Sequence, residues 1–148
     1  MNTLLRRRTL IAALATAGVV TVLAACSTMA PMMYGQEIAL SGANEVPPVA
    51  TTATGTGTVT INADRSVSAK ITVTGMTATA SHIHEGAAGA NGPVIVPFTK
   101  TADNTFASAE GAKLTEAQYA SYKAGNLYVN VHSAKNPGGE VRAQLKGN

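Results

Sequence analysis

Two histidines stand one residue apart in the stretch Ser81-His-Ile-His-Glu-Gly86, and the third histidine of the chain is His132. In a β-strand, residues i and i+2 project from the same face, so His82 and His84 would point together while Ile83 points the other way. Their Cα atoms would lie about 6.5 to 7 Å apart. Both rings would then reach one ion at about 2.0 to 2.1 Å, the usual distance from zinc to an imidazole nitrogen.

The segment around His132 supplies a third ligand. It alternates as a half-buried strand does: Tyr128, Asn130 and His132 share one face, and the aliphatic residues between them share the other. If the aliphatic face lies on the core, all three histidines lie on polar faces of the sheet. Three imidazoles with an open fourth position suit zinc or Cu(II). We therefore expect copper or zinc at His82, His84 and His132, lost as the rings become protonated near their usual pKa of about 6.5.

Other polar residues are expected around this cluster. The last alternating segment places Glu140 and Arg142 on the polar side of a strand, in the company of Asn130. Glu45 precedes two prolines, which remove hydrogen-bond donors from a strand ladder, so it is expected in a loop or an extended edge. We expect Arg142 to form an ion pair with Glu140 or Glu45. Glu85 falls on the opposite face from the histidines, so we expect a loop carboxylate there and not a ligand.

The same histidines also fit a purely structural role. Exposed strand positions are polar by default, and imidazoles would serve as hydrogen-bonding groups that fasten the loop between Gly86 and Gly92. Against this role, the chain places all three histidines in two motif segments and none elsewhere. The sequence leaves both interpretations open.

The first 25 residues resemble an export signal. Three arginines, Arg6–Arg8, form a basic start, and an apolar run that is short for a membrane span follows and ends in Leu23-Ala-Ala-Cys26. This ending resembles the signal of bacterial lipoproteins, in which the cysteine carries lipid and becomes the first residue. We therefore expect residues 1–25 to be removed and residues 26–35 to act as a flexible tether. The adjacent arginines fit twin-arginine export as well as the general route, and the sequence does not separate the two.

Lipidation at Cys26 would place the protein in the cell envelope. The chain would then be exported and held to a membrane, at the outer membrane or the periplasmic face if the organism has two membranes. Cys26 is also the single cysteine of the chain, so no disulfide forms within it.

The charge balance argues against a nucleic-acid partner. The chain has eleven Lys plus Arg and eight Asp plus Glu, and three of the eleven are the arginines of the signal. The mature chain is therefore nominally neutral and lacks the basic surface that nucleic-acid binders use. Its length suits one domain. We expect a monomer, and the sequence identifies no protein partner.

Short β-branched runs separated by Gly, Pro, Asn and Asp predict an all-β fold over residues 36–148. One segment breaks this pattern. Thr115 is followed by Gln118 three residues later and by Gly125 beyond Lys123, which predicts a short helix with a capping box and a glycine stop. Such a helix would cover one open end of a sandwich. Strands are expected near residues 37–40, 55–61, 66–74, 80–84, 94–99, 105–109, 126–132 and 140–145.

Four motifs together resemble the CHRD domain, a module named from chordin and common in bacterial exported proteins. The resemblance implies an immunoglobulin-like or superoxide-dismutase-like antiparallel β-sandwich, with no firmly established biochemical activity. The His-Ile-His-Glu sequence also resembles the copper-binding His-x-His of Cu,Zn superoxide dismutases. The four motifs are residues 40–49, residues 81–86 with 91–94, residues 127–133 and residues 136–145.

Three classes of function remain. They are a non-catalytic metal-binding lipoprotein, a copper oxidoreductase similar to superoxide dismutase, and a structural or adhesive module without metal. A copper–zinc pair of the dismutase kind needs more than the three histidines present. The single cysteine is the expected lipidation site, and no Gly-x-Ser-x-Gly motif for a nucleophile occurs. We therefore favour the non-catalytic binding module.

The lipid anchor is tested by replacing its cysteine. In the Cys26→Ala variant no thiol is left to carry lipid, so the protein is expected to move from the membrane fraction to the soluble fraction of the cell. Membrane fractionation followed by immunoblotting measures this shift. A variant that still fractionates wholly with membranes contradicts the assignment.

Overall fold

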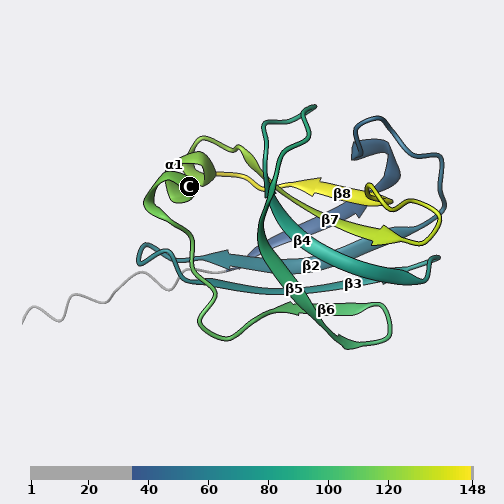
Figure 1. The fold of residues 1–148 in the computed structure, drawn as a ribbon, viewed down its shortest axis with the longest axis horizontal. Helices are drawn as coiled ribbons and strands as arrows, with labels where there is room; N and C mark the ends of the chain where they lie inside the picture. Colours follow the sequence, from purple (N-terminus) through teal and green to yellow (C-terminus); the bar gives the residue numbers. More distant parts are fainter. Residues whose placement is uncertain (1–34, 148) are drawn as a thin grey trace, which may run out of the picture. The chain divides into compact units, whose positions relative to one another are not determined.

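The alternating runs of the sequence form eight strands, and all eight expected strands and the expected helix are confirmed. The computed structural model describes residues 35–147. Threonine, valine and isoleucine occupy many strand positions because β-branched side chains fit a pleated, half-buried surface. In chain order the elements are β1 (Gln36–Ser41), the 3-10 helix η1 (Gly42–Asn44), β2 (Thr54–Ile61), β3 (Val67–Thr74), β4 (Ala78–Glu85), β5 (Val94–Ala102), β6 (Thr105–Ser108), α1 (Glu116–Lys123), β7 (Leu127–Ser133) and β8 (Val141–Gln144) (Figure 1).

The strands close into a barrel, and the expected two-sheet sandwich is wrong. Neighbouring strands are antiparallel, in the order β1-β2-β3-β6-β5-β4-β7-β8. β3 pairs with β6, and β8 returns to β1 through the single pair Ser41↔Arg142. These two pairings remove the open edges that a sandwich would keep. The all-β class with one short helix is confirmed.

Aliphatic side chains fill the barrel. Ile71, Ile83 and Val129 are fully buried, and the core continues onto every strand. Two glycines of β2 make room for them. A Cβ at Gly57 would lie 2.5 Å from Ile71 Cδ1, and a Cβ at Gly55 would lie 2.8 Å from a methyl carbon of Val73. The glycines therefore allow the β3 side chains to fill the interior.

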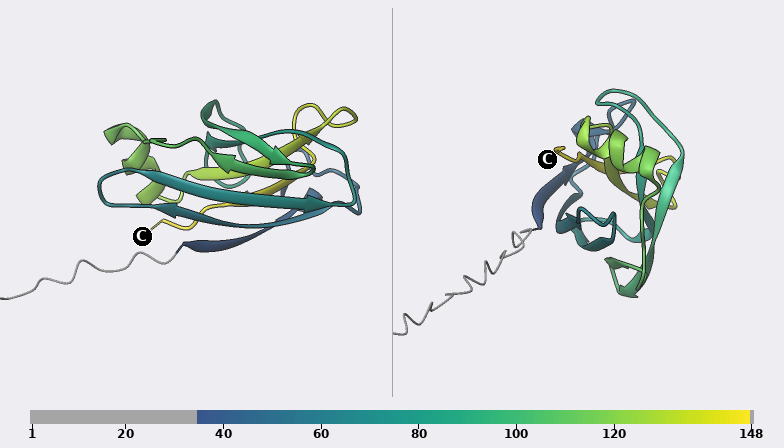
Figure 2. Two further views of the ribbon diagram at one scale, coloured as in Figure 1. Left: turned by 90° about the horizontal axis from the view of Figure 1, so that it is seen from below. Right: turned by 90° about the vertical axis from the view of Figure 1, so that its left-hand side faces the viewer.

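The helix α1 lies across one end of the barrel (Figure 2). It begins as expected, because the Thr115 hydroxyl accepts from the Gln118 backbone and the Gln118 side chain accepts from the Thr115 backbone. Gly125, at φ +75°, follows its last turn. Tyr122 is buried beneath the helix and Tyr119 packs against the core, so the helix closes this end. Among residues 35–147, no helix has the length and apolar character needed to cross a membrane.

β7 is buried on both of its faces. Its inward side chains, such as Val129 and Val131, belong to the barrel core. Its outward side chains lie under three loops, which comprise residues 42–50, 86–93 and 134–140. Figure 1 shows the loops after β1 and β4 rising on the same side of the barrel. The outward face of β7 is polar, so it forms a second, polar interior beneath these loops.

Direct contacts hold the three loops together. The Asn91 side chain donates to the Val46 carbonyl at 2.7 Å, which joins the first loop to the second. Gly139, in the third loop, lies against Glu45 of the first, since a Cβ there would be 2.5 Å from Glu45 Oε1. The segment with two prolines therefore lies in a loop, which is one of the two places expected for it.

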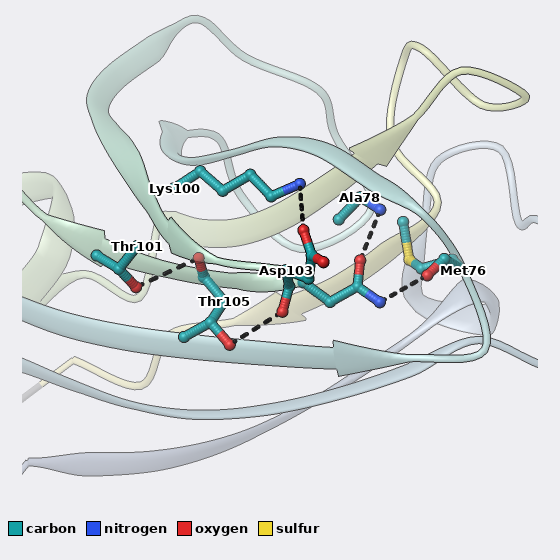
Figure 3. Close-up of polar contacts among 7 residues, drawn as sticks. Met76, Ala78, Lys100, Thr101, Asp103 and Thr105 are labelled. Carbon is teal, nitrogen blue, oxygen red and sulfur yellow. Dashed lines mark hydrogen bonds and ion pairs between the residues drawn. The ribbon is translucent and has the colours of Figure 1, made fainter.

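A different turn ties the β3–β4 connection to the β5–β6 hairpin. Asn104 takes a left-handed conformation at φ +55°. Its side chain accepts from the Ala78 backbone N–H at 2.9 Å and donates to the Met76 carbonyl at 2.8 Å. Figure 3 shows this turn, with the neighbouring Lys100–Asp103 ion pair on its surface.

Replacement of Asn104 tests this tie. Asn104→Ala removes both hydrogen bonds and places a Cβ with no polar group in the left-handed region, so we expect the free energy of unfolding to fall by about 2 to 3 kcal/mol. Urea denaturation followed by circular dichroism measures the change. Asn104→Gly, which tolerates the positive φ, should lose less. Asp103→Ala in the same turn is the control and should be nearly neutral, because its ion pair is exposed. Equal stabilities for Asn104→Ala and Asp103→Ala would contradict this role.

Candidate metal centre

The three histidines converge on the outward face of β4 and β7. Strand pairing places His82 opposite Asn130, and His132 lies two residues further along β7 on the same face. Ile83, between the β4 histidines, points into the core. One nitrogen from each ring of His82, His84 and His132 lies within 4.8 Å of the others. The expected cluster is therefore present, and no other comparable cluster of His, Cys, Asp or Glu occurs within residues 35–147.

Backbone carbonyls of the covering loops orient two of the rings. Nδ1 of His84 lies 2.9 Å from the Gly92 carbonyl, and Nδ1 of His132 lies 2.9 Å from the Pro137 carbonyl. A carbonyl only accepts, so each Nδ1 carries the hydrogen and each Nε2 carries a lone pair. Histidines that bind metals use the same device, in which an outer hydrogen bond selects the tautomer.

The ring of His82 lies beside the ring of His132. Nδ1 of His82 lies 3.0 Å from Nε2 of His132, and the ring centroids are 4.9 Å apart. Because His132 Nε2 carries a lone pair, His82 Nδ1 donates its hydrogen to it. Transfer of this hydrogen to the other nitrogen of the His82 ring would leave a lone pair on one nitrogen of each ring, and such nitrogens lie within 4.8 Å of one another. The site thus needs one tautomer change to offer three nitrogen ligands.

Burial favours the neutral form of the two β4 rings, His82 and His84. Burial, and then the neighbouring His132 and His84 rings, lower the pKa of His82 to about 4. Burial also lowers the pKa of His84, although the hydrogen bond to the Gly92 carbonyl and the nearby Asn130 side chain act in the opposite direction. Neutral imidazole is the form that binds metal. The rings therefore remain available to a metal below the pH at which an ordinary histidine becomes charged.

Tyr128 packs against one side of the histidine cluster. The sequence pattern did not single it out as a site residue. Its ring stacks on His84, with centroids 4.9 Å apart and planes at 10°. The guanidinium carbon of Arg142 lies 3.3 Å from the centroid of the same tyrosine ring. The Tyr128 hydroxyl accepts from the Gly92 N–H at 3.2 Å, the residue whose carbonyl holds His84. The alternation that placed Asn130 on this face also placed Tyr128 there.

Arg142 fastens a loop and does not form the expected ion pair. Its guanidinium, almost fully buried, donates to the Ala90 carbonyl at 2.8 Å and to the Asn91 side chain at 3.1 Å. Within residues 35–147 the ion pair present is Lys100–Asp103, so neither Glu140 nor Glu45 pairs with Arg142. The reason is geometric, because the carbonyls of the β4–β5 loop already surround the guanidinium.

Glu140 lies apart from the histidines. Its carboxylate accepts hydrogen bonds from the Thr51 hydroxyl, at 2.7 Å, and from the Ser133 hydroxyl. Burial opposes ionisation, but the hydrogen bonds from Ser133 and Thr51 outweigh it and lower the pKa of Glu140. The residue faces the pocket beside residues 50–52 and 75–77. Its expected place in the polar cluster is therefore wrong, although its side chain is buried and hydrogen-bonded.

Glu45 and Asn130 form an inner layer behind the cluster. Burial raises the pKa of Glu45 to about 7, against the lowering effects of Arg142, the Val46 N–H and Asn130. Asn130 is 2 % exposed and lies opposite His82. Both residues are thus near the cluster, as the sequence predicted.

Glu85 does not contribute to the cluster, as expected. It accepts a short hydrogen bond from the Ser121 hydroxyl of α1 and so joins the helix to β4.

The carbonyls of Gly92 and Pro137 are the site groups for which the sequence holds no signal, since any residue provides a carbonyl. Cys26, the expected lipidation site, lies outside the described residues.

The barrel and its loops match one protein family. Residues 37–145 match the model of the CHRD domain, which is well over half of the 148 residues. No curated protein and no solved structure matches the chain. The match spans all the histidines and both loops that orient them. The chain therefore belongs to the CHRD domain family.

Proposed function

We propose that this protein is a non-catalytic metal-binding module of the cell envelope. It binds one zinc or copper ion through His82, His84 and His132, and lipid at Cys26 holds it to the membrane. The observation that supports metal binding is the convergence of three ring nitrogens within 4.8 Å, two of them fixed as lone-pair donors by loop carbonyls. The anchor rests on the sequence of the first 26 residues alone.

The donor set favours zinc and copper over harder ions. Imidazole nitrogen is a borderline ligand that suits zinc, copper, iron and nickel, whereas magnesium and calcium prefer oxygen. The three nitrogens need to move apart only slightly to surround an ion, since His82 Nδ1 and His132 Nε2 are already 3.0 Å apart. The loops that cover β7 hold His84 and His132 in place, so little ordering is required on binding.

A binding role fits the site better than dismutase chemistry. The chain has three histidines, and all of them belong to this one cluster. They can bind one ion. A copper–zinc pair would need further histidines for its second ion. A structural role for the histidines makes a different prediction, namely no stoichiometric metal and a loss of stability on substitution that added ions do not change.

Replacement of the histidines separates these roles. The chain from Gly35, which contains every strand and the whole core, should bind about one equivalent of Zn(II) or Cu(II). His82→Ala, His84→Ala and His132→Ala should each weaken binding by at least about tenfold, or about 1.4 kcal/mol. Isothermal titration calorimetry measures the affinities.

Glu85→Gln provides the matched control for these variants. It alters a polar residue beside His84 that points away from the cluster, so its affinity for metal should equal that of the wild type. The melting temperature of the wild type should rise with added metal, because the folded state binds the ion more tightly than the unfolded chain does. Failure of the wild type to bind zinc or copper would reject the metal site and favour the structural role.

The pH at which metal is released tests the electrostatics of the site. Protons compete with the ion for the ring nitrogens, and the pKa of His82 is lowered to about 4. Competition should therefore begin at a pH below about 6.5, the usual pKa of histidine, on which the sequence-based expectation relied. We expect the midpoint of Zn(II) release to lie below pH of about 6.5, measured by equilibrium dialysis and atomic absorption, because His82 keeps its lone pair to lower pH. Release that is complete near pH 6.5 would contradict this environment.

A further inference from the structure

Buried acceptor atoms without donors lie behind the histidine cluster. Within residues 35–147, His84 Nε2, Asn130 Oδ1 and Glu45 Oε1 are buried and have no hydrogen-bond partner. His84 gives its ring hydrogen to Gly92, so its Nε2 is a lone-pair acceptor, as are an amide oxygen and a carboxylate oxygen. Folded proteins rarely leave such atoms unsatisfied, because a buried polar group without a partner costs stability. A bound cation would satisfy acceptors of this kind.

Asn130 lies on the same sheet face as the histidines, behind the cluster. It lies opposite His82 across β4 and β7, and it shares the outward face of β7 with His132. Its side chain is 2 % exposed, so it is enclosed among the rings and the covering loops.

The two ends of the Asn130 amide point in different directions. Nδ2 lies 3.5 Å from the Gly138 carbonyl, and a Cβ at Gly139 would be 2.7 Å from Nδ2 and 2.5 Å from Glu45 Oε1. The nitrogen is therefore directed at the β7–β8 turn and at Glu45. The oxygen, at the other end of the amide, is buried and has no hydrogen-bond partner.

We propose that Asn130 Oδ1 is the fourth ligand of the ion that the three histidines bind, and that Glu45 and the Gly138 carbonyl position it. The site then has three nitrogens and one oxygen and takes a four-coordinate divalent ion of the Zn(II) class, rather than Cu(I), which prefers sulfur ligands. This inference rests on the proposed metal-binding function. It gives two buried acceptors that have no donor, His84 Nε2 and Asn130 Oδ1, a partner in the same ion.

Two substitutions of Asn130 test the fourth ligand in the purified protein. Asn130→Asp keeps an oxygen and adds charge, so Zn(II) affinity should rise by about tenfold or more. Asn130→Leu removes the oxygen at similar volume, so affinity should fall by about tenfold or more. Competition with a chromophoric chelator measures both. The absorption bands of Co(II), substituted for Zn(II), should change in shape and intensity in both variants because the ligand set changes.

Asn44→Asp is the matched control. It makes the same chemical change at an exposed residue next to Glu45, and it removes only the hydrogen bond from the Asn44 side chain to the Arg142 carbonyl, at 3.2 Å. It should therefore leave the affinity and the Co(II) spectrum unchanged. Thermal unfolding without metal verifies that each variant is folded. If Asn130→Leu does not fold, Asn130→Asp alone still decides the test. Glu45→Gln should weaken Zn(II) binding less than Asn130→Leu does, because it acts only on the orientation of the amide.

The outcomes distinguish this inference from the function on which it rests. If the wild type binds Zn(II) and folded Asn130 variants show the same affinity and the same Co(II) spectrum, Asn130 is not a ligand and the three-histidine site stands alone. If Asn44→Asp and Asn130→Asp raise the Zn(II) affinity equally, the rise comes from general charge attraction. That result would also show that Asn130 is not a ligand. A wild type that binds no Zn(II) rejects the histidine site and this inference together.

Discussion

Burial of both faces of β7 is the constraint on which the rest of this structure depends. One face completes the apolar core of the barrel, and the other carries Tyr128, Asn130 and His132 beneath three loops. Polar groups removed from water need partners inside the protein, because an unmet hydrogen bond costs about 1 to 3 kcal/mol. The loops provide those partners with their backbone. Their carbonyls therefore serve two purposes at once: they satisfy the polar face, and they determine how its rings are oriented.

Arg142 shows how this second interior is held together. Its buried guanidinium reaches the carbonyls of the β4–β5 loop on one side and covers the Tyr128 ring on the other. A planar group with five N–H donors can satisfy several acceptors and lie flat on an aromatic ring at the same time, whereas the compact ammonium of lysine has three donors and no flat face. Tyr128 in turn stacks on His84. The position of the His84 ring thus follows from the strand that closes the barrel, since Arg142 is also the β8 residue that pairs with β1.

The same burial prepares the histidines chemically. A ring that is removed from water loses some of its tendency to take up a proton, so the pKa of His82 and that of His84 fall. Neutral rings with a fixed tautomer are the form in which histidine binds metal. Burial raises the pKa of Glu45 by the same mechanism, which reduces the negative charge behind the cluster. A single physical cause, exclusion of water from the outward face of β7, therefore accounts for the perturbed groups at this site.

Local pattern in the sequence determined the strands, the capped helix and the shared face of His82, His84 and His132. Alternation with a period of two is encoded within each segment, and so are a Thr115–Gln118 capping box and a glycine stop. Closure of the barrel, the place of Glu140 beside Thr51, and the loop carbonyls that replaced the expected ion pair of Arg142 were decided by the tertiary structure alone. The physical reason is that these features depend on which distant segments meet. Alternation specifies which face a residue occupies, but not which strand lies beside it or which loop covers it.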